Sequence, residues 1–445
     1  MNELAERLLA RARALGAEEA EVYLSRGSEF TVKVFQGRVE SLVSADSRGL
    51  GLRTFRERRV GFAYTSELEP AALDALVEEA IGNGRYNHAE EANVLPDPEP
   101  IEPLQGVYVP ELLTYDPERK VDFALALERV ATSLDPRVTR VSDAVYSDGA
   151  GRVELANSRG VDAAFERTVA YGVIDAIAEQ DGEMQSGFAF TYGRDLEALD
   201  GVAAAREAVD NATGLLGARR AKTARVPVVL HPHAAAMLLG VIGSSFSGDA
   251  VLKRRSLLAG KVGQVVASTH VAIVDDARLP TGLASRPFDG EGVRARRVEL
   301  ITDGVLRGYL QNTYTARRSG ERSTGSAVRT YKSVPEVGVT NLMLQPGGER
   351  REALLARVSN GLHVEQLHGL NTVNPVSGEF SFGVTGHWIR DGALAEPVRE
   401  MTVAGNLISL LRSIVGLADD LRFLFAGGFC GSPSVLIEEL PIGGD

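Results

Sequence analysis

The sequence predicts an α+β protein with a duplicated helix-strands-helix N-terminal part, followed by a β-rich C-terminal domain with inserted helices. Helical periodicity flanks runs rich in Val, Phe, Tyr and Thr, this order occurs twice, and Asp-Gly pairs typical of hairpins mark the second half. A chain of 445 residues also exceeds the usual domain of about 100–200 residues. The predicted division is residues 1–87, an N-terminal α+β domain; 88–117, a proline-rich linker; 118–224, a central α+β domain; and 225–445, the β-rich domain.

The first predicted unit begins with a helix that Asn2 caps and Gly16 ends, with apolar residues along one face. Short strands separated by glycine or charged turns follow, and a second helix over residues 69–81 completes the order helix, strands, helix. The predicted strands cover residues 21–25, 29–35, 38–43, 50–55 and 59–65.

Prolines crowd the next segment, where they break helices and withhold backbone donors. They are Pro96, Pro98, Pro100, Pro103, Pro110 and Pro117. This density predicts an extended linker.

The second unit repeats the order of the first, with a helix over 118–134, strands to about Tyr192 and a helix over 195–216. Residues 40–50 and 153–161 each place Ser-Arg-Gly after a strand pattern. This shared sequence has two possible origins, which are duplication of one unit and the independent appearance of two similar strand-turn-strand units.

The last half is dense in hairpin signals, because Asp-Gly permits the positive φ angles of a tight turn. Asp303-Gly304 joins two strand patterns, and Asp391-Gly392 follows an alternating strand. Two helical patterns interrupt these strands, one over residues 234–246 and one from Leu407 to Ile414.

Lys+Arg 48 against Asp+Glu 60 gives a net charge of −12, which argues against broad nucleic-acid binding. The only cysteine is Cys430, so an intrachain disulfide is impossible. The acidic start of the chain does not resemble a signal peptide, and no apolar run approaches the ~18 residues of a membrane span. We therefore expect a cytoplasmic protein that does not insert into membranes.

Two histidine pairs are candidate metal ligands. His231 and His233 stand where a strand meets a helix, but no third ligand accompanies them. His363 and His368 are five apart, which on a regular helix turns them about 140° away from each other. For both pairs the structural interpretation is favoured over a metal role, and no metal site is predicted.

Residues 243–248 place Ser244 and Ser245 between glycines, but a nucleophile elbow needs a shorter Gly-to-Gly spacing and a preceding strand. A helix end explains this segment better. No phosphate-binding glycine motif occurs. Cys430 follows Gly427-Gly428-Phe429, where it is either a small buried residue or a site residue.

Several segments of the second half together resemble the TldD/PmbA family, also called TldE or modulator of DNA gyrase proteins. They are Ser247-Gly248-Asp249-Ala250, Ser256–Gly263, Gly282–Gly292 with the sequence GLASRPFDGEG, Asn374–Ser381, and Ala404-Gly405-Asn406-Leu407. The resemblance spans nearly the whole chain.

The resemblance implies two types of chain that pair. The TldD type carries His-Glu-x-x-x-His, whose histidines hold zinc with a downstream cysteine while the glutamate acts as general base. Here the corresponding positions, counted back from Gly248-Asp249, are Leu239, Gly240 and Ser244. Cys430 has the setting of the ligand cysteine, but one thiolate cannot build a three-ligand catalytic site.

The resemblance therefore implies a PmbA/TldE-type subunit without zinc or catalytic residues of its own, which completes a zinc peptidase with a TldD-type partner. The expected substrate is an unfolded or modified peptide, and in isolation the chain can form a homodimer. The expected cleft residues are Ser244, Ser245, Gly248, Asp249 and Cys430.

Two alternatives stay open. One is a binding protein that regulates DNA gyrase or toxin–antitoxin components without proteolysis. The other is a metal-free hydrolase that uses Ser244 or Ser245.

Overall fold

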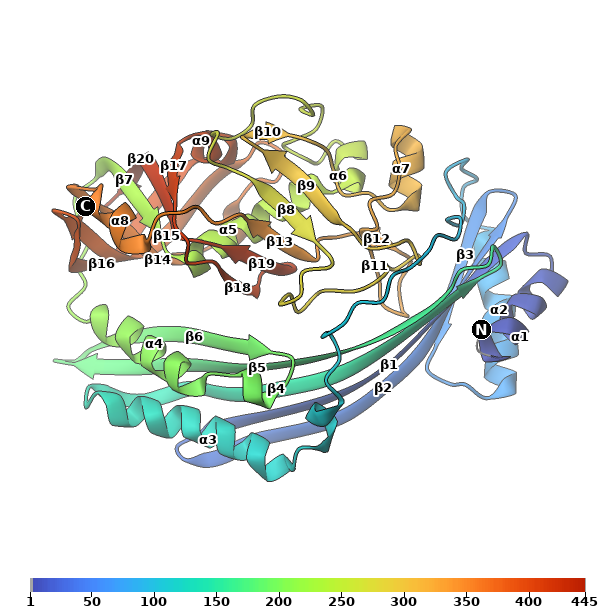
Figure 1. The fold of residues 1–445 in the computed structure, drawn as a ribbon, viewed down its shortest axis with the longest axis horizontal. Helices are drawn as coiled ribbons and strands as arrows, with labels where there is room; N and C mark the ends of the chain where they lie inside the picture. Colours follow the sequence, from blue (N-terminus) through green and yellow to red (C-terminus); the bar gives the residue numbers. More distant parts are fainter. Residues whose placement is uncertain (1–2, 445) are drawn as a thin grey trace.

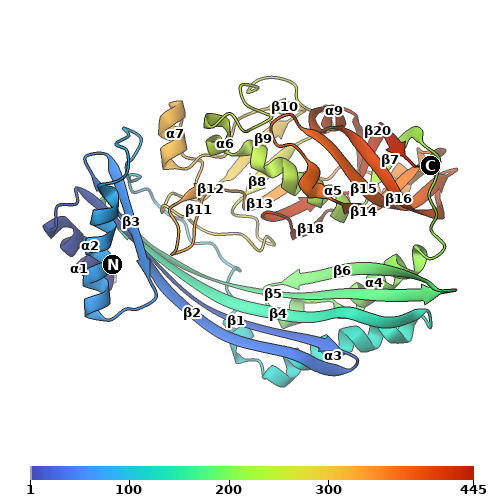
Figure 2. The ribbon, with the colours of Figure 1, turned by 180° about the vertical axis from the view of Figure 1, so that it is seen from behind.

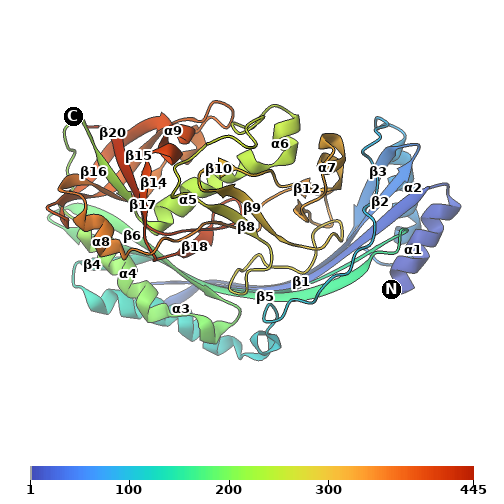
Figure 3. The same ribbon diagram turned by 45° about the horizontal axis from the view of Figure 1, so that its top comes forward.

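The computed structural model describes residues 3–444. A long curved sheet holds the C-terminal half of the chain on its concave face and the helices α3 (Pro117–Leu134) and α4 (Gly201–Gly214) on the opposite face (Figure 1). The helices α1 (Glu3–Ala14) and α2 (Pro70–Gly84) lie at one end of this sheet (Figure 3). The fold is α+β, as predicted.

The curved sheet has six strands in the order β3-β2-β1-β4-β5-β6. They are β1 (Glu19–Phe35), β2 (Arg38–Arg56), β3 (Arg59–Thr65), β4 (Val138–Asn157), β5 (Asp162–Gln180) and β6 (Glu183–Gly193). The central strands β1 and β4 are antiparallel, with Val22 opposite Ala156, so both predicted N-terminal units share one sheet. Each unit follows the order helix, three strands, helix, which confirms the duplicated arrangement.

The predicted strand breaks near residues 26–28 and 44–49 are wrong, because β1 and β2 run through them. Gly27 pairs with Ser47 on one side and with Gly151 on the other. Pairing with two neighbours satisfies the backbone donors and acceptors on both sides, which outweighs the local turn preference of Arg-Gly-Ser.

The helix boundaries follow the sequence with small shifts. Gly16, with φ +95°, ends the first helical segment, whereas the predicted cap at Asn2 lies outside the described residues. The helix expected over 195–216 is a 3-10 turn, η2 (Leu196–Ala198), followed by α4.

The proline-rich segment is extended, apart from the 3-10 turn η1 (Pro110–Thr114), and it is packed against the protein. Val94 and Leu95 are buried. The Glu99 carboxylate accepts hydrogen bonds from the backbone N–H of Arg294 at 2.7 Å and from the guanidinium of Arg296 at 2.5 Å. This segment therefore fastens the N-terminal sheet to the C-terminal half.

The C-terminal half contains a six-stranded sheet in the order β16-β15-β14-β7-β20-β17, and the pairing of β16 with β20 closes it into a barrel. Its strands are β7 (Ala224–Leu230), β14 (Asn360–His368), β15 (Glu379–Arg390), β16 (Ala393–Asn406), β17 (Ile414–Leu417) and β20 (Val435–Gly443).

A second six-stranded sheet has the order β10-β9-β8-β13-β19-β18. Its strands are β8 (Ile273–Asp276), β9 (Arg297–Thr302), β10 (Val305–Leu306), β13 (Asn341–Leu344), β18 (Arg422–Phe425) and β19 (Phe429–Ser432). The short strands β11 (Ala327–Val328) and β12 (Glu336–Val337) form a separate ribbon.

Helix α5 (Pro232–Gly243) lies between the two C-terminal sheets and contacts β13, β14, β18 and β19 (Figure 3). With the 3-10 turn η3 (Ser244–Phe246) it accounts for the helix predicted over 234–246. The other helices are α6 (Gly248–Leu252), α7 (Thr313–Ser319), α8 (Arg351–Ala356), α9 (Leu407–Arg412) and the 3-10 turn η4 (Leu370–Thr372).

Both predicted Asp-Gly hairpins are confirmed. Asp303 and Gly304 have φ angles of 50° and 75° between β9 and β10, and Asp391 and Gly392 have 47° and 80° between β15 and β16. Within residues 3–444, no helix is both long enough and apolar enough to cross a membrane.

Candidate functional site

The positions that the resemblance assigns to the zinc motif lie on and just after α5, where Leu239 is buried, Gly240 is partly buried and Ser244 is exposed. Leu239 is 4% exposed and belongs to the same apolar cluster as Cys430. Gly240 packs against Ala426, since a Cβ at this position would lie 2.3 Å from the Ala426 carbonyl oxygen. Leu239 and Cys430 thus share one apolar cluster, and Ala426 contacts both Gly240 and Cys430.

Cys430 is fully buried on β19, and its Sγ donates a hydrogen bond to the carbonyl oxygen of Ala426 at 3.2 Å. Burial raises the pKa of this thiol to about 12, and the nearby charge of Asp275 acts in the same direction. Without a bound metal ion, Cys430 is therefore protonated near neutral pH.

The two serines do not form a catalytic pair with a base. Ser244 is exposed, and its hydroxyl donates to the carbonyl oxygen of Val241 at 3.0 Å. Ser245 is buried, and its carbonyl oxygen accepts the hydroxyl of Ser256 at 2.6 Å. Among the described residues, neither hydroxyl has a hydrogen bond to a histidine or a carboxylate.

Gly248 and Asp249 lie away from Cys430. Gly248 packs against Gln311, and Asp249 forms an ion pair with Lys253 at 2.8 Å. Asp249 lines a cavity of about 480 Å³ between the N-terminal sheet and the C-terminal half, and Cys430 is not part of its lining. The expected cleft residues thus do not line one cavity: Ser245, Gly248 and Cys430 are buried, Ser244 is exposed, and Asp249 lines the cavity of about 480 Å³.

The residues at the motif positions do not fit a zinc ion. An aliphatic side chain, a glycine against a backbone carbonyl and an exposed serine provide neither imidazole nor carboxylate, and the single thiol of Cys430 cannot supply a three-ligand site. No step of a reaction is therefore assigned to zinc at this place in the chain.

A group of histidines that the sequence analysis did not assemble lies on the barrel. His363, Glu365 and His387 present ligand-type atoms that all lie within 4.8 Å of one another. Glu365 Oε1 is 2.9 Å from Nδ1 of His387 and 3.4 Å from Nδ1 of His363. His363 and Glu365 share one face of β14, while His387 comes from the neighbouring strand β15.

The hydrogen-bond partners indicate which nitrogens in this group carry protons. Nε2 of His387 donates to the carbonyl oxygen of Gly214 at 2.8 Å while its Nδ1 faces the carboxylate of Glu365, so the ring is an imidazolium. The guanidinium of Arg351 lies 3.3 Å from Nε2 of His363 and can only donate, so Nδ1 of His363 carries the proton.

Electrostatics agree with this assignment. Burial by itself lowers the pKa of His387, but hydrogen bonding and attraction to Glu365 raise it above the usual value. Burial by itself raises the pKa of Glu365, but the two histidines lower it strongly. We therefore assign the group as a buried ion pair that joins the barrel to the end of α4.

A cavity of about 380 Å³ lies next to this ion pair, and its lining residues come mainly from β6, α5, β14 and β18. In Figure 2, β18 of the C-terminal half lies over the part of the curved sheet that contains β6. Phe188, His233, Met237 and Phe425 are among the side chains that line it, together with Glu365. Both strands are the last in their sheets. Aromatic contacts join them, with the ring centroids of Phe190 and Phe425 6.0 Å apart. An apolar cavity between two strand edges suits the side chains of an extended peptide.

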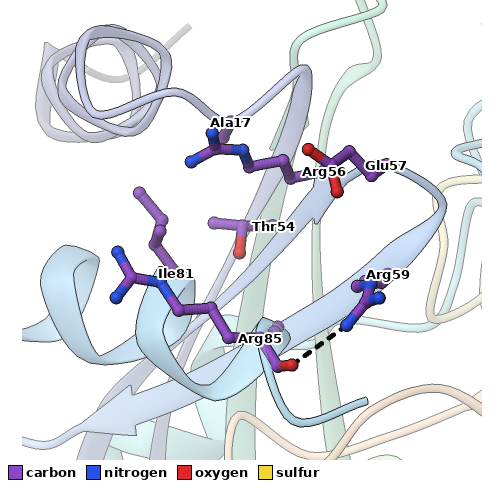
Figure 4. Close-up of a pocket in the computed structure, with 9 residues that line it drawn as sticks. Ala17, Thr54, Arg56, Glu57, Arg59, Ile81 and Arg85 are labelled. Carbon is purple, nitrogen blue, oxygen red and sulfur yellow. Dashed lines mark hydrogen bonds between the residues drawn. The ribbon is translucent and has the colours of Figure 1, made fainter. Parts of the chain in front are cut away.

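Another cavity, of about 390 Å³, lies between α2 and the turn that joins β2 to β3 (Figure 4). Arg56, Arg59 and Arg85 are among its lining residues, and Arg59 donates to the carbonyl oxygen of Arg85 at 3.1 Å. None of the site residues expected from the sequence lines this cavity.

Comparison with known proteins places the chain in a family. Three family models match it in succession: PmbA/TldA metallopeptidase domain 1 at residues 20–84, the central domain at 110–216 and the C-terminal domain at 223–444.

Metalloprotease PmbA from Escherichia coli O157:H7 is 29% identical over 444 residues, covering 96% of this chain and 93% of the relative. A metalloprotease TldD homolog from Haemophilus influenzae is 30% identical over 428 residues, covering 89% of this chain and 87% of the relative.

Solved structures show the same fold. A candidate modulator of a DNA gyrase from Thermotoga maritima has a TM-score of 0.91 at 28% identity and covers 99% of each chain. TldE from Thermococcus kodakarensis has a TM-score of 0.91 at 24% identity, covering 99% of this chain and 100% of that chain. The chain therefore belongs to the PmbA/TldD metallopeptidase family, as its C-terminal segments predicted.

Proposed function

We propose that this chain is a PmbA/TldE-type subunit that contributes peptide binding and assembly to a zinc metallopeptidase, while a TldD-type partner supplies the zinc and the general base. The observation that carries the proposal is the lack of imidazole and carboxylate groups at the motif positions, together with their packing against apolar neighbours. Leu239, Gly240 and Cys430 occupy the places of ligands and base, but they pack into an apolar cluster or against Ala426. Without a partner, the chain therefore has no zinc peptidase activity.

The two strand edges beside the aromatic cavity suit an unfolded substrate. β6 pairs only with β5, and β18 only with β19, among the described residues. An extended peptide pairs its backbone with such an edge, and its apolar side chains enter the cavity lined by Phe188 and Phe425. Backbone pairing reads little sequence, which fits a peptidase for unfolded or modified peptides.

The exposed half of β2 is the proposed surface for assembly. β3 pairs with β2 only from Leu50 onward, so residues 38–49 have an open edge. Val39, Leu42 and Val43 on this stretch are 43%, 49% and 50% exposed. An unpaired strand edge with exposed apolar side chains among polar ones favours pairing with a strand of another subunit, here the TldD-type partner.

Co-expression with a TldD-type chain tests the proposal. Zinc content and peptide cleavage are measured for each subunit alone and for the purified complex. We expect cleavage by the complex and none by this chain alone. Removal of the partner's His-Glu-x-x-x-His ligands is expected to abolish cleavage, whereas Cys430→Ala in this chain is expected to preserve it.

Peptide cleavage by the isolated chain that depends on bound zinc would overturn the proposal. Binding of a regulatory target such as DNA gyrase, without cleavage by the complex, would instead support the alternative of a non-proteolytic binding protein.

A further inference from the structure

The cavity of about 390 Å³ between α2 and the turn that joins β2 to β3 gathers three arginines (Figure 4). Arg56 and Arg59 stand directly opposite each other in the pairing of β2 with β3, so their side chains leave the same face of the sheet. Arg85 reaches the cavity from the end of α2. Like charges at directly opposed positions destabilise a sheet, so this arrangement favours a bound anion.

The described residues leave these arginines without carboxylate partners. Within residues 3–444, the guanidinium groups of Arg56 and Arg85 have no hydrogen bond and no carboxylate oxygen within 4.0 Å. Arg59 donates only to the carbonyl oxygen of Arg85, and its Nε has no partner in the same part of the chain. The lining includes one acid, Glu57, and therefore carries three positive charges against one negative charge, a net charge of +2.

The charged and polar groups around the cavity have other partners. Glu18 lies beside the turn, where its carboxylate accepts the backbone N–H of Glu57 at 3.3 Å, but it does not line the cavity. Arg58, in the same turn, forms an ion pair with Glu91 at 3.6 Å. The carbonyl oxygens at the end of α2 repel an anion, but those of residues 82–85 each accept a hydrogen bond.

The remaining lining groups suit a small anion with an organic body. In the view of Figure 4, the side chain of Thr54 lies between those of Arg56 and Arg85. Its hydroxyl has no hydrogen bond to another described residue and is free to donate to a ligand. Ala17 and Ile81 add apolar surface. The volume of about 390 Å³ lies in the range of small-molecule sites.

We propose that Arg56, Arg59 and Arg85 bind a phosphate dianion in this cavity, carried by a small phosphate monoester or free in solution. A phosphate monoester has a charge of about −1.5 to −2 at pH 7, which matches the net charge of +2 in the lining better than a carboxylate does. The planar guanidinium fork pairs two N–H groups with phosphate oxygens. Nucleic acid is disfavoured as the source of the phosphate, because a long polyanion also meets the rest of a chain with a net charge of −12.

The site is separate from the proposed peptide site. It borders β3, whereas β6, beside the aromatic cavity, is the opposite edge of the curved sheet. Binding of phosphate here needs neither zinc, nor a partner, nor a peptide, so its test does not depend on the proposed function.

Isothermal titration calorimetry of the intact chain with phenyl phosphate, phenylacetate and inorganic phosphate tests the site. Phenyl phosphate and phenylacetate share an aromatic ring and differ in the anionic group. We expect phenyl phosphate to bind at one site, about tenfold or more tightly than phenylacetate. Arg56→Met and Arg85→Met are each expected to weaken the binding of phenyl phosphate by about tenfold or more.

The matched control is Arg58→Met, which removes the same charge from the same turn but not from the lining of the cavity. We expect this variant to keep the affinity within about twofold at physiological salt, where exposed charges are screened. Arg56, Arg58 and Arg85 are all exposed, so the three variants are expected to fold with nearly unchanged melting temperatures. If one lining variant does not fold, the other carries the test.

Each outcome bears on the site. A lack of saturable binding of phenyl phosphate at millimolar concentrations overturns it, and so does binding that Arg56→Met and Arg85→Met leave unchanged. An equal loss of affinity in Arg58→Met also overturns it, because the effect is then one of overall charge. Equal affinity for phenylacetate overturns the choice of phosphate. Equal affinity for inorganic phosphate and phenyl phosphate supports the site and assigns free phosphate as its ligand, whereas tighter binding of phenyl phosphate assigns a monoester.

Discussion

The contact between α5 and the turn before β19 makes a sharp prediction about Gly240. A Cβ at Gly240 would lie 2.3 Å from the carbonyl oxygen of Ala426 and 2.8 Å from its Cβ. The first of these atoms is backbone, so Gly240→Ala requires the turn at residues 426–428 to move. The same obstacle meets Gly240→Glu, the substitution that would restore the glutamate of the zinc motif.

The expected size of the effect follows from two opposing terms. Overpacking of a dense core costs about 1–3 kcal/mol, and a backbone contact this short favours the upper end of the range. Alanine improves on glycine in a helix by about 1 kcal/mol. The net loss is therefore about 2 kcal/mol, or about 4–8 °C in melting temperature for a unit of roughly 200 residues.

Urea unfolding followed by tryptophan fluorescence measures this loss in the right part of the molecule, because the only tryptophan is Trp388, which shares an apolar cluster with Leu239. Gly348→Ala is the matched control in the same half of the chain, since a Cβ there meets no heavy atom within 4 Å. We expect this control to keep or slightly raise the stability. If Gly240→Ala is as stable as the control, the steric argument is refuted.

Three further predictions concern buried polar groups. His387→Gln is expected to lower the free energy of unfolding by about 1.5–3 kcal/mol. Because the pKa of His387 is raised and that of Glu365 is lowered, this difference is largest from pH 4.5 to 6.5 and shrinks above and below that window. Urea unfolding of both proteins across this pH range measures it. Cys430 is expected to resist a thiol reagent at mildly alkaline pH and to react once the chain is unfolded; rapid labelling of the native protein would contradict its burial. Arg53→Met leaves two buried glutamates without their shared partner and is expected to destabilise the fold by about 3–5 kcal/mol, whereas Arg129→Met is expected to change the melting temperature little.

Local chemistry in the sequence predicted much of the architecture. Both Asp-Gly hairpins, the repeated order of helix, strands and helix, and the helix over 234–246 depend on neighbouring residues and were confirmed. The family segments were equally readable, and family membership was confirmed. A turn or a helix needs only the dihedral preferences and side-chain period of one stretch of chain, which the sequence states directly.

Cross-strand register and burial depend on residues far apart in the sequence. Only the tertiary structure decided these two features. From the sequence, His363 was considered only together with His368, whereas the place of His387 opposite His363 follows from the pairing of β14 with β15. The physical reason is that a side chain's partners are set by the packing of sheets whose strands lie far apart in sequence, and no local period encodes that packing.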